Sequence, residues 1–141
     1  MIPNKKKYDT MNDVKITERG WAGHFICADK CYFRRNTLIE CNRDRIVVST
    51  VGDYRSTNGP IEEIGHERYY ETKAFAGIKQ GYYWDADFEK EIPFDSKSDI
   101  SSATGPSGLK LAVDNEANEM HDDVVAELVE KMKTEKKGNG K

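Results

Sequence analysis

Hydrophobic and polar residues alternate over short stretches between residues 13 and 95, and turn residues separate these stretches. Val14 and Ile16 alternate with polar neighbours, and the β-branched run at residues 46–51 favours a pleated, half-buried surface. An Asn-Gly-Pro sequence and a Lys-Gln-Gly sequence mark later turns. The pattern predicts strands at residues 14–16, 21–26, 31–41, 46–51, 68–78 and 82–88, with an extension at 92–94.

The C-terminal part of the chain has a different period, because its apolar residues recur at helical spacing. Acidic residues lie near the start of this segment and lysines near its end, which suits the helix macrodipole. The apolar stripe must be buried, and one face of the sheet is the obvious partner. The stripe consists of Leu111, Ala117, Val124, Leu128 and Met132.

Together these elements predict an α+β fold, with an antiparallel β-meander sheet of five to six strands packed by one C-terminal helix. We expect a disordered arm at residues 1–12, one domain at residues 13–133 and a disordered tail at residues 134–141, because both ends are polar and aperiodic. The strands carry more aromatic residues than one helix can cover. The other face is therefore exposed, closed by curling of the sheet or buried in a homodimer.

Composition narrows the classes of function. Hydrophobic residues make up 37% of the chain and charged residues 33%, and no apolar run is long enough to span a membrane. The net charge of −3, with both signs interspersed, does not fit a general nucleic-acid binder. Three cysteines and no export signal at the N-terminus predict reduced thiols in a cytosolic setting.

The first chemical candidate is the group His24, Cys27 and Cys31, with Cys41 further along. Such ligands can hold zinc. However, the spacing matches no common zinc finger, and Cys31 and Cys41 would lie far apart on one face of a straight strand. Small buried cysteines are the favoured interpretation, with a metal site and a regulatory disulfide as alternatives.

The second candidate is the pair Arg34 and Arg35, followed by Asn36. Alternation along a strand places one of these arginines on the core face, where a guanidinium needs carboxylate or carbonyl partners. Either arginine is then part of a structural salt bridge or binds a phosphate or carboxylate of a ligand.

Two further groups of polar residues are candidates for binding. Arg68, Tyr69, Tyr70, Trp84 and Asp85 lie on strands that are expected to pair, and such a surface can stack a base, anchor a protein or simply stabilise the sheet. On the helix, His121 shares a flank with Asn118 and Asp122, which suits a metal, a general base or a polar boundary.

None of the common enzyme motifs occurs in the sequence, and we expect no cofactor. The alternative from another class is a metal-binding, hydrolase-like protein that uses His24, His66 and His121.

The motifs Gly-Trp-Ala-Gly-His-Phe at residues 20–25, Phe-Arg-Arg-Asn-Thr-Leu at 33–38, Arg-Tyr-Tyr-Glu-Thr at 68–72, Tyr-Trp-Asp at 83–85 and Met-His-Asp at 120–122 carry a resemblance. The chain resembles a family of small tailed-bacteriophage and prophage proteins. The resemblance implies a host bacterial cytoplasm and no catalytic residue. A structural or assembly accessory protein of the phage is an alternative.

The leading hypothesis is a phage-encoded, non-enzymatic binding protein. Its partner is expected to be a host defence protein or a small nucleotide signal, which it would bind or sequester. The expected surface centres on Arg34, Arg35, Tyr69, Tyr70 and Trp84.

Overall fold

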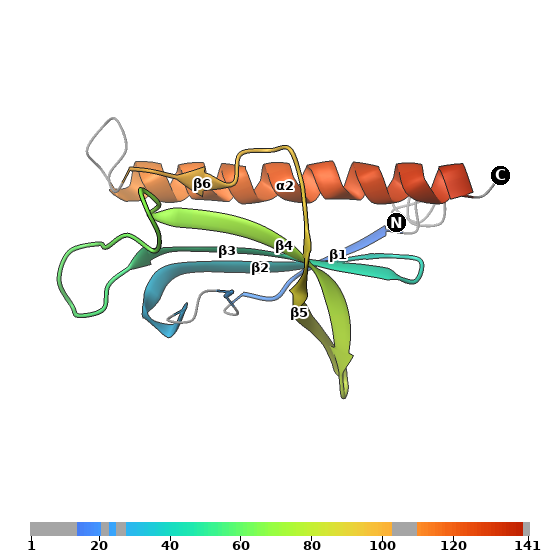
Figure 1. The fold of residues 1–141 in the computed structure, drawn as a ribbon, viewed down its shortest axis with the longest axis horizontal. Helices are drawn as coiled ribbons and strands as arrows, with labels where there is room; N and C mark the ends of the chain where they lie inside the picture. The colour runs from blue at the N-terminus through green and yellow to red at the C-terminus, as the bar shows by residue number, and fades with distance from the viewer. Residues whose placement is uncertain (1–13, 21–22, 25–27, 103–109, 140–141) are drawn as a thin grey trace, which may run out of the picture.

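The computed structural model describes residues 14–20, 23–24, 28–102 and 110–139. In this part of the chain, a six-stranded antiparallel sheet is covered on one face by a single α-helix (Figure 1). The predicted α+β class is confirmed, and so is the predicted packing of one C-terminal helix on the sheet.

The strands follow one another across the sheet in chain order, from β1 to β5, and each pairs antiparallel with the next. The short strand β6 pairs with the beginning of β4. The elements are β1 (Val14–Glu18), the 3-10 helix η1 (Ala28–Lys30), β2 (Cys31–Cys41), β3 (Asp44–Tyr54), β4 (Tyr70–Gln80), β5 (Tyr83–Ile92), β6 (Asp99–Ile100) and α2 (Lys110–Asn139).

Several boundaries differ from the prediction. The strand expected at residues 46–51 is longer, because β3 pairs with β2 along nearly its whole length. Most of the strand expected at residues 21–26 lies outside the described residues, and Gly23 and His24 are not in a strand. The arm expected at residues 1–12 also lies outside them. Helix α2 continues to Asn139, past the expected end at residue 133.

Tight turns at left-handed residues join the long strands. Asn42 has a φ of 58° between β2 and β3, and Gly81 has a φ of 62° between β4 and β5. Asparagine and glycine tolerate this conformation better than other residues do. Both hairpins are therefore set by local sequence, as expected from residues 42–44 and 79–81.

Side-chain alternation gives each strand one residue toward α2 and the next away from it. On β2 and β3, Ile39, Cys41, Ile46 and Val48 belong to the core beneath the second half of α2. Each fully buried aliphatic side chain of this kind contributes about 1.5–3 kcal/mol. From α2 this core receives Val124, Leu128, Val129 and Met132.

A second core lies beneath the first half of α2, and a third lies on the opposite face of the sheet. The second contains Tyr70 and Ile100 together with Val113, Ala117 and Met120 of the helix. On the opposite face, half-buried Trp84 packs on a smaller core of Leu38, Val47, Phe75 and Ala86.

No helix in the described part of the chain is both long enough and apolar enough to cross a lipid bilayer.

Gly52 is required by the close packing of Tyr70. A Cβ atom at Gly52 would lie 2.1 Å from Cδ2 of the Tyr70 ring, which is itself completely buried. We expect Gly52→Ala to lower the free energy of unfolding by about 1–3 kcal/mol, as overpacking of a core does. Urea titration followed by circular dichroism measures this change.

Two comparisons test the cause of this loss. Gly59→Ala places a Cβ only against the exposed Thr57 hydroxyl and should have a much smaller effect. In a Tyr70→Ala background, the added methyl group meets no ring, so its cost should largely vanish. An equal cost in both backgrounds would contradict the steric explanation.

Candidate functional site

A cleft of about 660 Å³ opens where β2 begins and β3 ends. One wall comes from η1 and the start of β2, and the other comes from the loop that follows β3. The lining residues are Asp29, Lys30, Cys31, Tyr32, Arg34, Arg55, Ser56, Thr57 and Asn58.

Hydrogen bonds join the two walls. The backbone N–H of Arg55 donates to the Lys30 carbonyl over 3.0 Å, and Lys30 Nζ donates to the Ser56 carbonyl over 3.3 Å. The loop is further held by Glu62, whose carboxylate accepts bonds from the N–H and hydroxyl of Ser56. These bonds lower the pKa of Glu62. The cleft is therefore shaped by backbone contacts and does not depend on its basic side chains alone.

The lining is positively charged. Lys30, Arg34 and Arg55 carry three positive charges against Asp29 in the lining, and Asp53 behind Arg55 offsets one more, which leaves a local net charge of about +1. Arg55 is held in place, because its Nε donates to the buried Asp53 over 2.8 Å and its Nη1 donates to the Gly59 carbonyl over 3.3 Å. A guanidinium held in this way can meet an anion without first losing its own rotational freedom.

Tyr32 adds an aromatic surface to the cleft. The Arg55 guanidinium carbon lies 5.3 Å from the centre of its ring, within cation–π range. Its hydroxyl donates to Asn58 Oδ1 over 3.4 Å, yet the residue remains 63% exposed. One ring face is therefore covered by a cation, and enough of the ring is left in solvent to contact a ligand.

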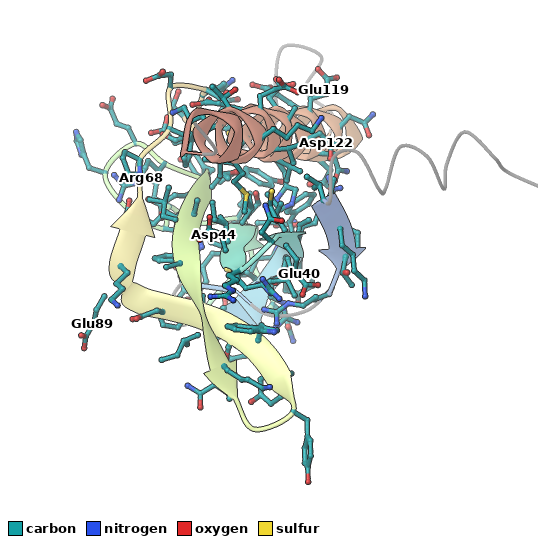
Figure 2. All side chains as sticks on the ribbon, turned by 90° about the vertical axis from the view of Figure 1, so that its right-hand side faces the viewer. Glu40, Asp44, Arg68, Glu89, Glu119 and Asp122 are labelled. Carbon is teal, nitrogen blue, oxygen red and sulfur yellow. The ribbon has the colours of Figure 1, made fainter. Side chains whose placement is uncertain are left out.

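Arg35 lies on the other face of the sheet from Arg34, because the two residues are adjacent on β2. Its Nε and Nη2 bind both carboxylate oxygens of Glu18 at 3.1 and 2.8 Å, and Nη2 also lies 2.8 Å from Asp122. Figure 2 shows Asp122 on α2, above the sheet. Arg35 therefore forms the structural salt bridge that was one of its two predicted roles, and it clamps β1, β2 and α2 together.

His121, on α2, is completely buried between the helix and the sheet, where it belongs to a network of hydroxyl groups. Its Nε2 lies 2.7 Å from Thr37 Oγ1, and its Nδ1 lies 2.7 Å from Thr50 Oγ1. Thr50 in turn lies 2.6 Å from Thr72, and Thr37 donates to Glu18 over 2.7 Å.

The Glu18 carboxylate at one end fixes the donor and acceptor of each hydrogen bond in this network. Thr37 gives its only hydroxyl proton to Glu18, so it must accept the Nε2–H of His121. Nδ1 of neutral His121 then accepts from Thr50, and Thr50 accepts from Thr72. A second proton on the His121 ring, at Nδ1, would reverse the hydrogen bonds from the ring to Thr50 and from Thr50 to Thr72. Burial accordingly lowers the pKa of His121 to about 4.

His24 lies against the opposite face of the sheet. Its Nδ1 lies 2.9 Å from Ser49 Oγ and its Nε2 lies 3.2 Å from Glu71 Oε1, while Arg68 Nε lies 3.4 Å from the other oxygen of Glu71. Burial alone would raise the pKa of Glu71, but His24 and the nearby lysine and arginine outweigh it, and the pKa is lowered.

Serine, histidine and glutamate in this order resemble a nucleophilic triad. Ser49, however, is only 1% exposed, so a substrate cannot reach its hydroxyl. The group instead attaches His24 to β3 and β4.

The other predicted residues do not form one surface. Tyr70 is buried beneath α2, where its hydroxyl donates to Asp114 over 2.7 Å and its pKa is raised by burial. Asn36 is buried on the opposite face and accepts a bond from Arg19 over 2.8 Å. Arg19 also contacts the Trp84 carbonyl and Asp85. The expected surface around Arg34, Arg35, Tyr69, Tyr70 and Trp84 is therefore divided between two faces and two ends of the sheet.

The three histidines are also separated. His121 contacts Thr50 and His24 contacts Ser49, and these neighbours on β3 point to opposite faces of the sheet. His66 lies in an exposed loop, 3.3 Å from Glu67. Within the described residues, no three His, Cys, Asp or Glu side chains are arranged to hold a metal ion. Cys27 lies outside the described residues. Cys31 and Cys41 are both buried, which agrees with the interpretation of small buried cysteines that the sequence favoured.

Sequence reasoning missed most of the cleft. Lys30, Tyr32, Arg55 and Asn58 come from two segments that meet only because β2 and β3 pair in antiparallel register. The Asn-Gly-Pro turn signal at residues 58–60 marked the loop, but its neighbour across the sheet was not evident.

The fold and the cleft define a small α+β protein with a helix-covered antiparallel sheet and a basic recess at one end. Comparison with known proteins found no matching family model, no matching curated protein and no matching solved structure.

The hydrogen bonds of buried, neutral His121 predict that the stability of the protein depends on pH. Because folding lowers the pKa of His121 from 6.5 to about 4, its contribution is complete above pH 6.5 and is lost as the pH falls toward 4. The shift corresponds to about 3 kcal/mol. We expect His121→Gln to be less stable than the wild type at pH 7.5, and the difference in unfolding free energy to narrow by pH 4.

Glu18, Arg35 and Asp122 remain in both proteins, so their own titration largely cancels in this difference. Urea unfolding at pH 7.5 and at pH 4 measures the difference in unfolding free energy between the two proteins. A difference that stays constant or widens toward pH 4 would contradict the proposed neutral state of His121.

Proposed function

We propose that this protein is a non-enzymatic binding protein that holds a small phosphorylated ligand in the basic cleft. The observation that supports the proposal is the convergence of Lys30, Arg34 and Arg55 on a recess that also presents Tyr32. Guanidinium and ammonium groups are the preferred protein partners of phosphate oxygens. Arg34 is the member of the predicted arginine pair that lines the cleft.

The biological setting follows from the resemblance to phage proteins and is part of the same proposal. In an infected bacterial cytoplasm, a protein that sequesters a phosphorylated signal would counter a host defence that depends on it. The cleft requires no cofactor for such a role.

Charge removal in the cleft should weaken phosphate binding. We expect Lys30→Ala and Arg34→Gln each to weaken pyrophosphate binding about 10- to 100-fold, because a hydrogen bond to a charged group contributes about 1.5–3 kcal/mol. Isothermal titration calorimetry measures the dissociation constants.

Arg43→Ala is the matched control, because Arg43 is exposed in the turn between β2 and β3, at the other end of these strands. It removes the same charge and should leave the affinity almost unchanged. Equal losses in all three variants would indicate a general effect of net charge, and no binding by the wild type would exclude the proposal.

A second candidate function, contact with another protein, is favoured by the hairpin of β4 and β5. The hairpin projects beyond the rest of the sheet (Figure 1) and exposes Ile78, Tyr82, Tyr83 and Phe88. Exposed aromatic residues of this kind anchor protein interfaces. Either a host protein or a second copy of the chain would bury them.

The homodimer can be tested with the purified protein. Strand β5 carries Asp85, Asp87, Glu89 and Glu91 against Lys90, and Glu89 points away from the body of the molecule (Figure 2). We expect a dimer at tens of micromolar that strengthens with salt, because salt screens this repulsion. The double variant Tyr82→Ser, Tyr83→Ser should sediment as a folded monomer. A wild type that remains monomeric at high salt would contradict the dimer.

A further inference from the structure

We infer that the ligand of the basic cleft is a guanine nucleotide. Its phosphates lie against Lys30, Arg34 and Arg55, its base stacks on Tyr32, and the N–H edge of the base binds Asp29. This inference rests on the proposed phosphate binding in the same cleft and assigns the remainder of the ligand.

The size of the cleft admits a ligand larger than a phosphate. A volume of about 660 Å³ lies within the range of about 300–1,000 Å³ that is usual for pockets that bind organic ligands. A phosphate group bound to the cations would occupy only a small part of it. The cleft therefore has room for a second portion of the ligand, which the other lining residues would recognise.

Tyr32 indicates that this portion is flat and aromatic. Its ring is fixed by Arg55 on one face and by the hydrogen bond from its hydroxyl to Asn58, while the residue stays 63% exposed. A fixed ring gives a stacking surface at little entropic cost. Stacking of a nucleic-acid base on such a ring contributes about 1–3 kcal/mol.

Asp29 selects among the bases. Its carboxylate would repel the phosphates and would favour a ligand portion that presents hydrogen-bond donors to it. Two carboxylate oxygens suit two adjacent N–H groups, as a bidentate pair. Guanine offers this pair at N1 and its exocyclic amine, whereas the corresponding edge of adenine or cytosine places an acceptor beside its amino group.

Asn58 complements this selection. Its side-chain oxygen accepts the Tyr32 hydroxyl, so its amide N–H groups face other partners. They are suited to donate to the carbonyl oxygen of guanine, a position at which adenine carries an amino group. Asp29 and Asn58 therefore favour the same base.

GDP, ADP and pyrophosphate, which each carry two linked phosphates, separate the contribution of the base from that of the phosphates. In magnesium-free buffer, calorimetry should show GDP binding at least ten-fold more tightly than ADP or pyrophosphate. Tyr32→Leu should weaken both nucleotides and spare pyrophosphate. Asp29→Asn should abolish the preference for GDP over ADP without weakening pyrophosphate binding.

The possible failures are distinguishable. Equal affinity for GDP and ADP, or a preference that survives Asp29→Asn, would overturn the guanine assignment while pyrophosphate binding would still support the cleft. Absence of binding by all three ligands would overturn the proposed function together with this inference.

Discussion

The alternation of side chains along β2 and β3 is the constraint on which the rest of the structure depends. Arg34 and Arg35 are consecutive, and so are Ser49 and Thr50, yet the members of each pair serve opposite faces of the sheet. One face receives α2, and the other receives His24. A shift of one residue in strand register would exchange these roles and bury the wrong groups.

The helix is attached to the sheet by polar as well as apolar contacts. Hydrophobic cores lie beneath both halves of α2, but between them stand His121 and Arg35 with their partners on β1, β2 and β3. Buried polar groups of this kind are costly unless every member finds its partner, so they fix one position of the helix along the sheet. An apolar helix stripe alone would specify that position less strictly.

The same alternation separates the side chains that contact the helix from those that line the cleft. Arg35, Tyr70 and His121 are taken up by the helix side, while Arg34 remains on the side where β2 and the loop after β3 form the cleft. The proposed ligand site therefore lies at one end of the sheet, fixed by strand pairing. The aromatic hairpin tip of β4 and β5 is a separate surface, and contact with a protein there would not compete with a ligand in the cleft.

The sequence by itself determined the element types, because period, turn residues and β-branched runs act locally. It indicated the meander, the bounds of β2, the turns at Asn42 and Gly81, and the structural salt bridge of one arginine of the pair. Only the tertiary structure decided which arginine forms the salt bridge with the helix, because that depends on which face the helix covers. It also decided that Lys30 and Arg55 meet beside Tyr32 and that the histidines lie apart, because contacts between distant segments follow from strand register and helix placement.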